Sequence, residues 1–508
     1  MEQRGRTREG QEQGPELGEL ETPDPLAALA DRAGEADDRP GRRLLGKGSI
    51  YTLGAALQLS AAALAIPVIT RLLGSGEFGV VALAMAIQLM LTGLATLGLP
   101  AAILRFFFDH ERTADGAAAS RSLIISAALI AAAVVCPILF TGLIWAPELS
   151  PKDPGPVLLG AFLALPAAVI GACLALLRAQ ERPRPFIVIT LLASAGAQLF
   201  GIVALLIDRQ PFAYVTGVAI AFVIAAIAAL RLTETLGSPP ANRSLLGSAL
   251  RYSIPTIPNT ISVSVLAVGD RIVIQAISGS SAVGKYQIAN AFGTLVVGFL
   301  VALQNAWIPI TFGASEERRW DTLAEVAALV TRLAALGAGV LALLALPILE
   351  IVVPRGYDPE HLADVASVAV LTSLPEVAFI AQGQILLWTK QTKPLFLISP
   401  AAAALNLILV AVLLPPFGLI GAAAATVLAV FAQAAMTRRV AASMAHVSWH
   451  WTSEAASYLI AATLVAIALL LPSTAWAIGV RAAVSALAAG TLLIVVRREF
   501  RPGWFRLG

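Results

Sequence analysis

Long apolar runs separated by short polar connections fill almost the whole chain after residue 48. A helix that crosses a membrane needs about 20 predominantly apolar residues, and a window of ~19 residues resolves such runs along the chain. Twelve runs form two groups of six, at 49–70, 79–103, 122–145, 155–177, 186–207 and 211–230, then at 252–277, 284–312, 323–353, 365–388, 394–414 and 417–436. A final pair follows at 455–471 and 473–496. The pattern predicts an all-α, polytopic membrane protein with fourteen transmembrane helices.

The two groups of six begin on the same side of the membrane, which predicts two six-helix lobes in parallel pseudo-repeat. The predicted lobes are 49–230 and 252–437, joined by a cytoplasmic linker at 231–251 and followed by the last two helices and a tail at 438–508. A short motif supports the repeat, because Gly74 to Gly79 and Gly279 to Gly284 share the spacing G-S-x-x-x-G at an offset of 205 residues. Repeats of this kind are typical of transporters with a central site, although any tight turn uses Gly and Ser.

Composition removes several classes of protein. Of the 508 residues, 58% are hydrophobic and 13% are charged, whereas soluble domains carry about 25% charged residues. Water-soluble enzymes, secreted disulfide scaffolds and nucleic-acid-binding modules are therefore excluded, and no nucleic-acid partner is expected. Residues 1–48 are rich in Glu, Gly, Pro and Arg without apolar periodicity, which predicts a disordered cytoplasmic tail.

The basic residues orient the chain in the membrane. Connections on one side hold nineteen of the Lys and Arg residues that follow residue 48, and connections on the other side hold six. Because Lys and Arg concentrate in cytoplasmic loops, both termini are predicted to be cytoplasmic, in the cytoplasmic membrane of a bacterium. The outer connections are short, the longest being 146–154 and 354–364. An enzyme that polymerises sugars outside the cell needs a larger outer domain, so we predict that the chain is not an enzyme.

Three stretches carry a resemblance to a known family. The first is Leu45-Gly46-Lys47-Gly48-Ser49 with Thr70-Arg71-Leu72-Leu73-Gly74 and Glu77-Phe78-Gly79. The second runs from Tyr252-Ser253-Ile254-Pro255 through Gly269-Asp270-Arg271-Ile272-Val273-Ile274 to Val283-Gly284-Lys285-Tyr286. The third is Asn406 through Pro415, with Gly418 and Gly421-Ala422-Ala423. Together they resemble the Wzx-type polysaccharide flippases of the multidrug/oligosaccharidyl-lipid/polysaccharide exporter superfamily, over about residues 45–439.

The resemblance implies a function. Members of that family move undecaprenyl-pyrophosphate-linked oligosaccharides from the cytoplasmic to the outer leaflet by alternating access, for export of cell-surface polysaccharide. The resemblance also implies a lipid-linked oligosaccharide and membrane lipids as partners, with a polysaccharide polymerase or other envelope-synthesis proteins as further partners. A lipid II-type flippase and a drug/cation antiporter of the same superfamily remain alternatives. A scaffold for envelope synthesis that docks through the acidic tail is an alternative of a different class.

Uncharged polar residues cluster in the helices that line a cavity in this superfamily. They are Gln58, Gln88, Asn259, Asn290, Gln304 and Asn305. Amides offer both a donor and an acceptor to a glycan without net charge. The alternative is bonding between helices, worth only ~0.6 kcal/mol on average.

A second set of candidates lies toward the outer side. Asp270 is 19 residues beyond Arg251, or ~28 Å of helix, which places Asp270 and Arg271 near the outer rim. We predict an outer gate of Arg71, Asp270, Arg271 and Lys285 whose cations attract the pyrophosphate. The alternative is an interfacial ion pair between Asp270 and Arg271 that caps the seventh helix.

Two ionisable residues lie deep in the second predicted lobe. Arg332 in the ninth helix and Glu376 in the tenth both approach the midplane by helical rise. Charges there are functional candidates by default. The two are predicted to pair, either as a proton-coupling switch or as a static ion pair that holds the two helices together. No phosphate-binding loop of the G-x-x-x-x-G-K type is present, so coupling to a proton or sodium gradient or to the membrane potential is expected. No cofactor or metal is predicted.

Overall fold

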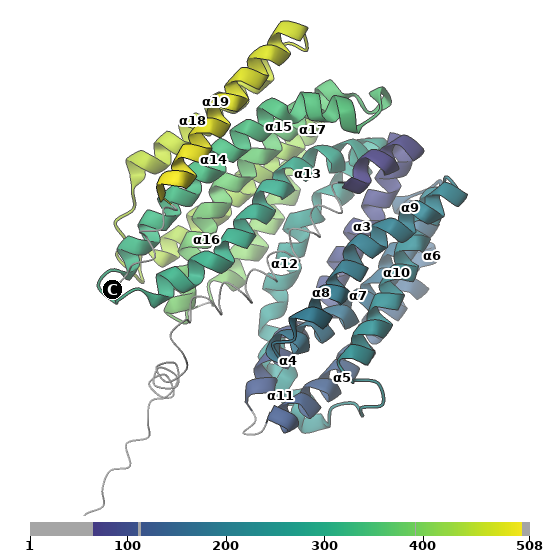
Figure 1. Ribbon diagram of the computed structural model, residues 1–508. Helices are drawn as coiled ribbons and strands as arrows, with labels where there is room; N and C mark the ends of the chain where they lie inside the picture. Colours follow the sequence, from purple (N-terminus) through teal and green to yellow (C-terminus); the bar gives the residue numbers. More distant parts are fainter. Residues whose placement is uncertain (1–63, 110–112, 392, 500–508) are drawn as a thin grey trace, which may run out of the picture. The chain divides into compact units, whose positions relative to one another are not determined.

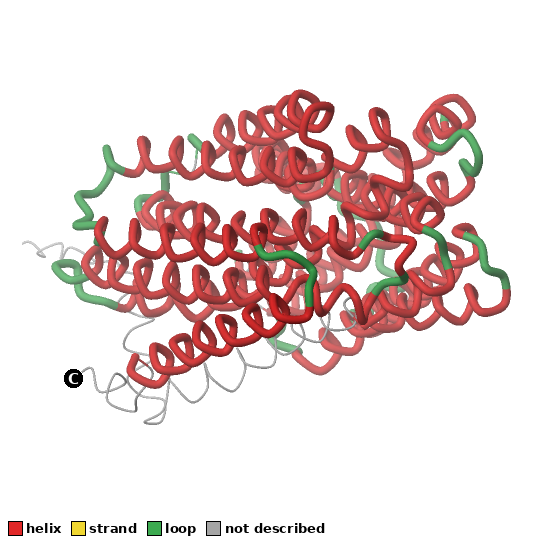
Figure 2. Tube along the Cα trace, turned by 90° about the horizontal axis from the view of Figure 1, so that it is seen from above, coloured by secondary structure: helices red, strands yellow, loops and turns green. Residues whose placement is uncertain are grey.

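The computed structural model describes residues 64–109, 113–391 and 393–499. The chain divides into two compact units, Met1–Ser49 and Ile50–Gly508, and the described residues all belong to the second. Predictions for the tail at 1–48, for Gln58 and for most of the first transmembrane helix lie outside the described residues. Within the described part every regular element is helical (Figures 1 and 2), which confirms the predicted all-α fold.

The first half of the chain begins with the end of a helix, described from Leu64 to Leu72. The helices that follow are α3 (Ser75–Ala95), α4 (Leu99–Phe108), α5 (Thr113–Phe140), α6 (Gly142–Leu149), α7 (Gly155–Ala179), α8 (Pro183–Leu191), α9 (Ala197–Ile207) and α10 (Pro211–Leu232). A single π-helical turn, Leu192–Gly196, joins α8 to α9, so these two make one membrane pass. Proline at the first turn of α4, α7, α8 and α10 suits these starts because its missing N–H has no partner there anyway.

The second half begins with α11 (Arg243–Ser253), whose first turn is capped by the Asn242 side chain. The elements after it are α12 (Ile257–Val268), α13 (Asp270–Gly313), α14 (Arg319–Val352), α15 (Pro359–Ala369), α16 (Ser373–Trp388), α17 (Leu395–Ala441), α18 (Trp451–Leu470) and α19 (Ala475–Glu499). Figure 1 shows α18 and α19, in yellow, beside α14. The predicted final helix pair is therefore present and packs on the second half.

Two long helices each contain a glycine break. Gly279 in α13 has φ 79° and Gly418 in α17 has φ 60°, a left-handed region that glycine enters without steric cost. Arg271 and Gln287 lie on either side of the first break and form a 3.0 Å hydrogen bond, although a straight helix would separate them by ~24 Å. The chain therefore reverses at Gly279, and α13 contains the end of one predicted transmembrane helix and the whole of the next.

The glycine breaks explain why the number of apolar helical stretches is smaller than the number of predicted transmembrane helices. Eleven stretches of the described residues are long and apolar enough to cross a membrane. Two of them, Arg243–Val301 and Leu395–Ala441, contain the glycine breaks and correspond to two predicted helices each. The protein is thus a multi-pass membrane protein, and the turns predicted at 277–284 and 414–417 lie at or next to the observed breaks.

Buried apolar side chains show where the two halves of the sequence meet. The largest cluster combines residues of both halves, such as Phe78 and Val81 with Tyr286 and Leu346. A second cluster contains only residues between Leu99 and Ala249, and a third only residues between Leu300 and Ala441. The shared cluster includes the helix ends near Leu73, Leu205 and Val353. The second and third clusters lie toward the other ends of the helices, next to the connections that are rich in Lys and Arg.

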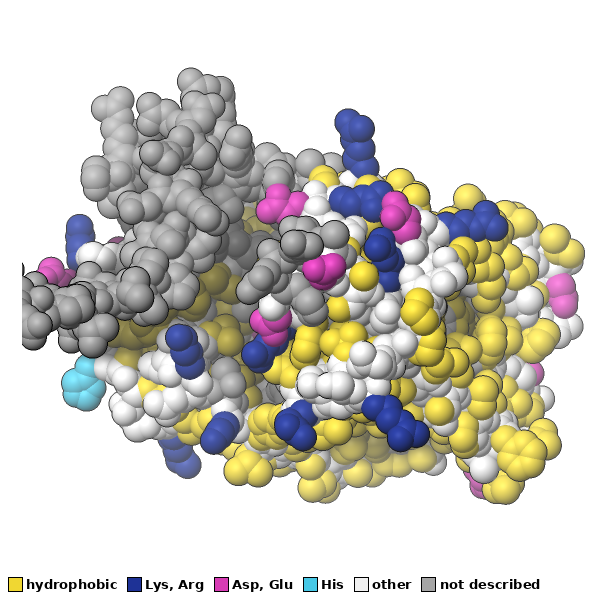
Figure 3. All heavy atoms as spheres, turned by 90° about the horizontal axis from the view of Figure 1, so that it is seen from below, with side chains coloured by type: hydrophobic (Ala, Val, Ile, Leu, Met, Phe, Trp, Pro, Cys, Tyr) yellow, Lys and Arg dark blue, Asp and Glu magenta, His cyan; other side chains and the backbone are white. Residues whose placement is uncertain are grey.

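We call these two sides the shared end and the basic end. Figure 3 views the molecule from below, where α4 and α11 lie in Figure 1, and shows Lys and Arg side chains scattered over that face. These are the loops whose Lys and Arg led to the orientation predicted from the sequence, and a cytoplasmic basic end stays a prediction.

Candidate functional site

The two G-S-x-x-x-G segments meet at the shared end. A Cβ built on Gly79 would overlap the Ser280 carbonyl and lie 3.0 Å from the Gly284 amide nitrogen. A Cβ built on Gly284 would overlap the Ser75 carbonyl and lie 2.9 Å from the Gly79 nitrogen. Because Ser280 and Gly284 are the repeat equivalents of Ser75 and Gly79, the contact is reciprocal. The motif that indicated a repeat only weakly in the sequence therefore forms a backbone-to-backbone contact between α3 and α13, which we call the glycine seam.

Hydrogen bonds reinforce the seam, one across it and two from the end of α14 and the connection that follows. The Ser75 and Ser281 hydroxyls are 2.8 Å apart. The Tyr357 hydroxyl donates to the Leu73 carbonyl at 2.8 Å, and Arg71 Nη2 donates to the Ile351 carbonyl at 2.8 Å. Burial, with a smaller contribution from the negative charge of Glu77, raises the pKa of Tyr357 well above its usual range, so its hydroxyl remains a donor at physiological pH.

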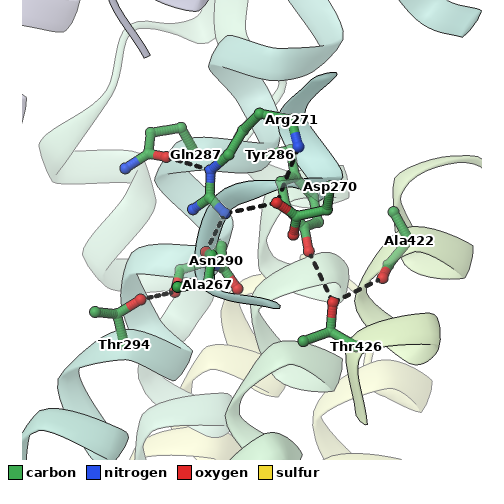
Figure 4. A network of polar contacts seen from close by, with 9 residues as sticks. All are labelled: Ala267, Asp270, Arg271, Tyr286, Gln287, Asn290, Thr294, Ala422 and Thr426. Carbon is green, nitrogen blue, oxygen red and sulfur yellow. Dashed lines mark hydrogen bonds and ion pairs between the residues drawn. The ribbon is translucent and has the colours of Figure 1, made fainter. Parts of the chain in front are cut away.

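Asp270 and Arg271 form a buried ion pair where α13 begins. Arg271 Nη1 donates to Asp270 Oδ1 at 2.7 Å and to the Ala267 carbonyl at 2.6 Å. Its Nε donates to Gln287 Oε1, and its guanidinium lies 5.7 Å from the Tyr286 ring centre. Figure 4 shows these groups around the pair and the Tyr286 hydroxyl reaching Thr426 of α17. The side chains of Asp270 and Arg271 are only 2% and 4% exposed, so the ion pair that was the alternative to an open gate is present and is buried within the protein.

The three cations assigned to an outer gate occupy different settings. Arg71 is exposed and bonded to helix carbonyls, Arg271 is buried in its ion pair, and Lys285 is half-buried. Arg271 does not lie open at a rim, as the sequence had suggested, because a charge at that depth is stable only with a partner. Among the described residues, Lys285 has neither a hydrogen bond nor an ion pair. A role of these cations toward pyrophosphate stays a prediction.

The amide candidates are only partly available to a ligand. Gln88 of α3 donates to Thr92 on its own helix at 3.0 Å, and Asn259 of α12 accepts a 2.7 Å hydrogen bond from Ser399 of α17. Asn290 and Gln304 of α13 are half-buried, and Figure 4 places Asn290 beside the ion-pair network. The side chain of Asn305 lies outside what the structure describes. Asn259 thus performs the helix-to-helix bonding that was the alternative, while the cavity role of the set stays a prediction.

The expected ion pair between Arg332 and Glu376 does not form. Arg332 is exposed on α14, and its Nε donates to Ser453 of α18 at 2.9 Å. Glu376 is half-buried on α16, and within the described part no cation lies within ion-pair distance of it. The prediction was wrong because depth along two helices does not fix which way their side chains point. Arg332 faces the last helix pair, whose position the sequence did not reveal.

Several buried polar groups were missed by sequence reasoning. The side-chain amides of Gln384 and Asn406 are fully buried, and neither has a hydrogen-bond partner in the described structure. Tyr357 is 2% exposed and was not singled out at all, because a tyrosine in a short connection is an ordinary interfacial residue. A cavity of about 330 Å³ between α3, α5, α6 and α13 has an almost entirely apolar lining that contains none of the predicted site residues.

Residues 44–314 match the family described as polysaccharide biosynthesis protein, which is more than half of the chain. The chain belongs to this family. No curated protein sequence matches it. Among solved structures, it is similar to the lipid II flippase MurJ in an inward closed conformation, with a TM-score of 0.69 and 14% identity over 90% of this chain and 99% of that one.

Two further solved structures share the fold of this family member. An inward-facing multidrug resistance MATE transporter of the MOP superfamily has a TM-score of 0.59 and 13% identity, over 77% of this chain and 98% of that one. A MOP superfamily transporter from Pyrococcus furiosus has a TM-score of 0.56 and 11% identity, over 85% and 99%. At these identities the likeness establishes the fold of MOP-superfamily transporters, and the substrate has to be argued from the chain itself.

Proposed function

We propose that this family member is a flippase that moves an undecaprenyl-pyrophosphate-linked oligosaccharide from the cytoplasmic to the outer leaflet by alternating access. The arrangement of the apolar cores carries the proposal. At the shared end one cluster joins many side chains of both halves, whereas at the basic end the second cluster takes from the second half only α11 residues such as Ala249, and the third takes nothing from the first half. Repeats that pack together on one side and separately on the other are arranged to rock about a site between them.

The chemistry between the halves supports a substrate that is neutral over most of its surface. Gln88 and Asn290 lie half-buried on α3 and α13, whereas Asn259 of α12 bonds to Ser399. Helix α3 packs directly on α12 where Gly93 meets Ser264. The buried charges at the start of α13 neutralise each other. Amides can therefore meet hydroxyl groups of a glycan, and half-buried Lys285 is the cation best placed to meet a pyrophosphate.

The family description favours a polysaccharide precursor over the alternatives. The similar solved structures include a lipid II flippase and multidrug transporters, so the fold alone leaves all three substrate classes open. A drug/cation antiporter would be expected to expose acidic groups in its site. In the described part, Asp270 is instead neutralised by its ion pair with Arg271, which is the observation against that alternative.

A reconstitution assay tests the proposal directly. Proteoliposomes are loaded with a labelled polyprenyl-pyrophosphate oligosaccharide, a lipid II analogue or a fluorescent organic cation, and each cargo is followed by its accessibility to an impermeant quencher or glycosidase. The proposal predicts protein-dependent movement of the oligosaccharide lipid. Movement of the lipid II analogue alone would indicate a lipid II flippase, and cation efflux alone an antiporter. No movement of any cargo would contradict a transport function.

Removal of residues 1–44 separates transport from scaffolding. A flippase whose site lies among its helices should still move lipid after this deletion, whereas a scaffold that docks through its acidic tail should lose its envelope-synthesis partners. The readouts are lipid translocation in proteoliposomes and co-purification of partner proteins from membranes. Loss of translocation with an intact fold would contradict the proposed location of the site.

A further inference from the structure

Two helix ends cap each other at the shared end. The helix described from Leu64 ends at Leu72, and α14 ends at Val352. The last carbonyls of any α-helix lack partners within the helix. Arg71 donates to the Ile351 carbonyl, and Thr70 Oγ1 lies 3.4 Å from the Val352 carbonyl, so residues of the first helix cap α14. In return Tyr357, just beyond α14, donates to the Leu73 carbonyl and caps the first helix.

Arg71 connects the two ends electrostatically as well. Its Nη1 donates to the Pro67 carbonyl of its own helix at 3.3 Å, while its Nη2 donates to the Ile351 carbonyl of α14. Each helix C-terminus carries about half a negative charge, so two of them side by side repel each other unless a cation lies between them. The guanidinium occupies that position, and its planar fork can serve two acceptors at once.

The mutual caps lie against the glycine seam. The Tyr357 ring packs edge-on against Phe78, with 6.5 Å between ring centres, and Phe78 is adjacent to Gly79. Both caps join residues 70–73 to residues 351–357, so each crosses from the first half of the chain to the second. A movement that separates the halves at the shared end must break both caps together with the seam.

We propose that Arg71 and Tyr357 form a clasp that sets how readily the shared end opens. This inference rests on the proposed alternating-access function, in which the closed shared end has to open once per cycle. The glycine seam supplies shape complementarity, and the clasp supplies the hydrogen bonds and the charge that favour the closed state. Arg71 is thus a conformational residue, engaged by two helix ends, rather than a receptor for pyrophosphate.

The clasp is tested by measuring opening rather than transport. In a background that lacks the two free cysteines, Cys136 and Cys173, Ser75→Cys serves as the reporter, because Ser75 lies in the seam. Its rate of modification by an impermeant maleimide is measured in nanodiscs. Tyr357→Phe removes one hydrogen bond and is expected to raise that rate about fivefold, and Arg71→Gln, which also removes the cation, about tenfold or more.

Matched controls separate the clasp from general loosening. Arg209→Gln removes an exposed arginine from another connection at the shared end, and Tyr252→Phe alters a tyrosine at the basic end, where it lies under Arg105. Neither should change the modification rate. Both clasp variants are expected to keep the fold, which unchanged thermal unfolding and gel filtration would verify. Modification rates equal to the reporter parent in Tyr357→Phe and Arg71→Gln would overturn the clasp.

Failure of the clasp and failure of the proposed function have different signatures. If the parent moves no lipid-linked oligosaccharide but the clasp variants expose Ser75→Cys, the clasp stands and the transport assignment fails. If the parent transports but the clasp variants leave modification unchanged, the transport assignment stands and the clasp fails.

Discussion

The ion pair at the start of α13 shows that a buried charge depends on one neighbouring counter-ion for its stability. Asp270 and Arg271 are adjacent in sequence and buried together, and Gln287 and Tyr286 return from beyond the Gly279 break to complete their surroundings. A buried charge left without its partner is strongly destabilising, whereas the pair itself contributes little net stability. The pair therefore fixes where the two arms of α13 lie against each other.

Asp270→Asn should destabilise the protein severely. The substitution leaves the Arg271 guanidinium buried without a counter-ion, at a cost of about 3–5 kcal/mol. Thermal unfolding in detergent and the yield of folded protein report this loss, with Asp208→Asn, at an exposed site in the described chain, as the control. The double variant Asp270→Asn with Arg271→Gln should recover part of the stability. Equal unfolding temperatures for Asp270→Asn and the parent would contradict a structural role for the pair.

Glu376 remains a candidate for ion coupling although its predicted partner faces elsewhere. Its carboxyl lies half-buried on α16, and no cation of the described residues pairs with it. An intramembrane carboxyl of this kind is a functional candidate by default. We expect Glu376→Gln to fold normally and to move lipid at a rate that no longer changes when a proton gradient is imposed on proteoliposomes. Retained gradient dependence in that variant would leave Glu376 with a packing role only.

At the scale of elements, the glycine seam depends on backbones that approach each other without side chains between them. Small residues allow such close packing of membrane helices. Gly79 and Gly284 have no room for a Cβ, whereas a Cβ built on Gly76, one turn earlier on α3, would meet no atom within 4 Å. The same helix thus contains both a glycine that the contact requires and one that it does not.

Gly79→Ala should weaken the closed shared end, whereas Gly76→Ala should not. An added methyl group against the Ser280 carbonyl forces the helices apart, and overpacking of this kind costs about 1–3 kcal/mol. Maleimide modification of the Ser75→Cys reporter should therefore become faster in Gly79→Ala alone. A similar rate in both variants would show that the close contact is not maintained in the membrane.

At the scale of the whole molecule, the apolar cores indicate which side is closed. The shared cluster joins long stretches of both halves, whereas the second cluster reaches the second half only at α11 and the third stays within the second half. The Ser75 and Ser281 hydroxyls, 2.8 Å apart at the seam, offer a site where closure can be trapped covalently, because Cys residues so close can form a disulfide.

A Ser75→Cys/Ser281→Cys disulfide should stop translocation, and a reductant should restore it. The cross-link prevents the halves from separating at the shared end. The control is a cross-link within one half, between Thr233→Cys and the native Cys173, whose side-chain atoms are 3.8 Å apart in the parent. That control should transport normally because the half moves as a unit. Full transport by the seam disulfide would contradict opening at this end.

The repeat of apolar segments was sufficient to predict an all-helical membrane protein and the turns near Gly279 and Gly418, because helix length and bilayer thickness constrain each other. It did not predict the break at Gly98 between α3 and α4, which the predicted helix 79–103 runs through. The short G-S-x-x-x-G repeat pointed to two segments that the structure brings into contact. Sequence reasoning also found the Asp270 and Arg271 pair. It failed at Arg332, which bonds to Ser453, and at Tyr357, which it did not select.

Apolar periodicity and glycine position act locally, so the amino-acid order was enough to establish the kind of each element and its place along the chain. Which helix faces meet was settled only by the assembled fold. Whether Arg71 is an open cation or a cap on α14 depends on residues about 280 positions away, and no local pattern encodes that distance. Side-chain direction on a packed helix is set by its neighbours, so the partners of intramembrane charges emerge only when the helices are assembled.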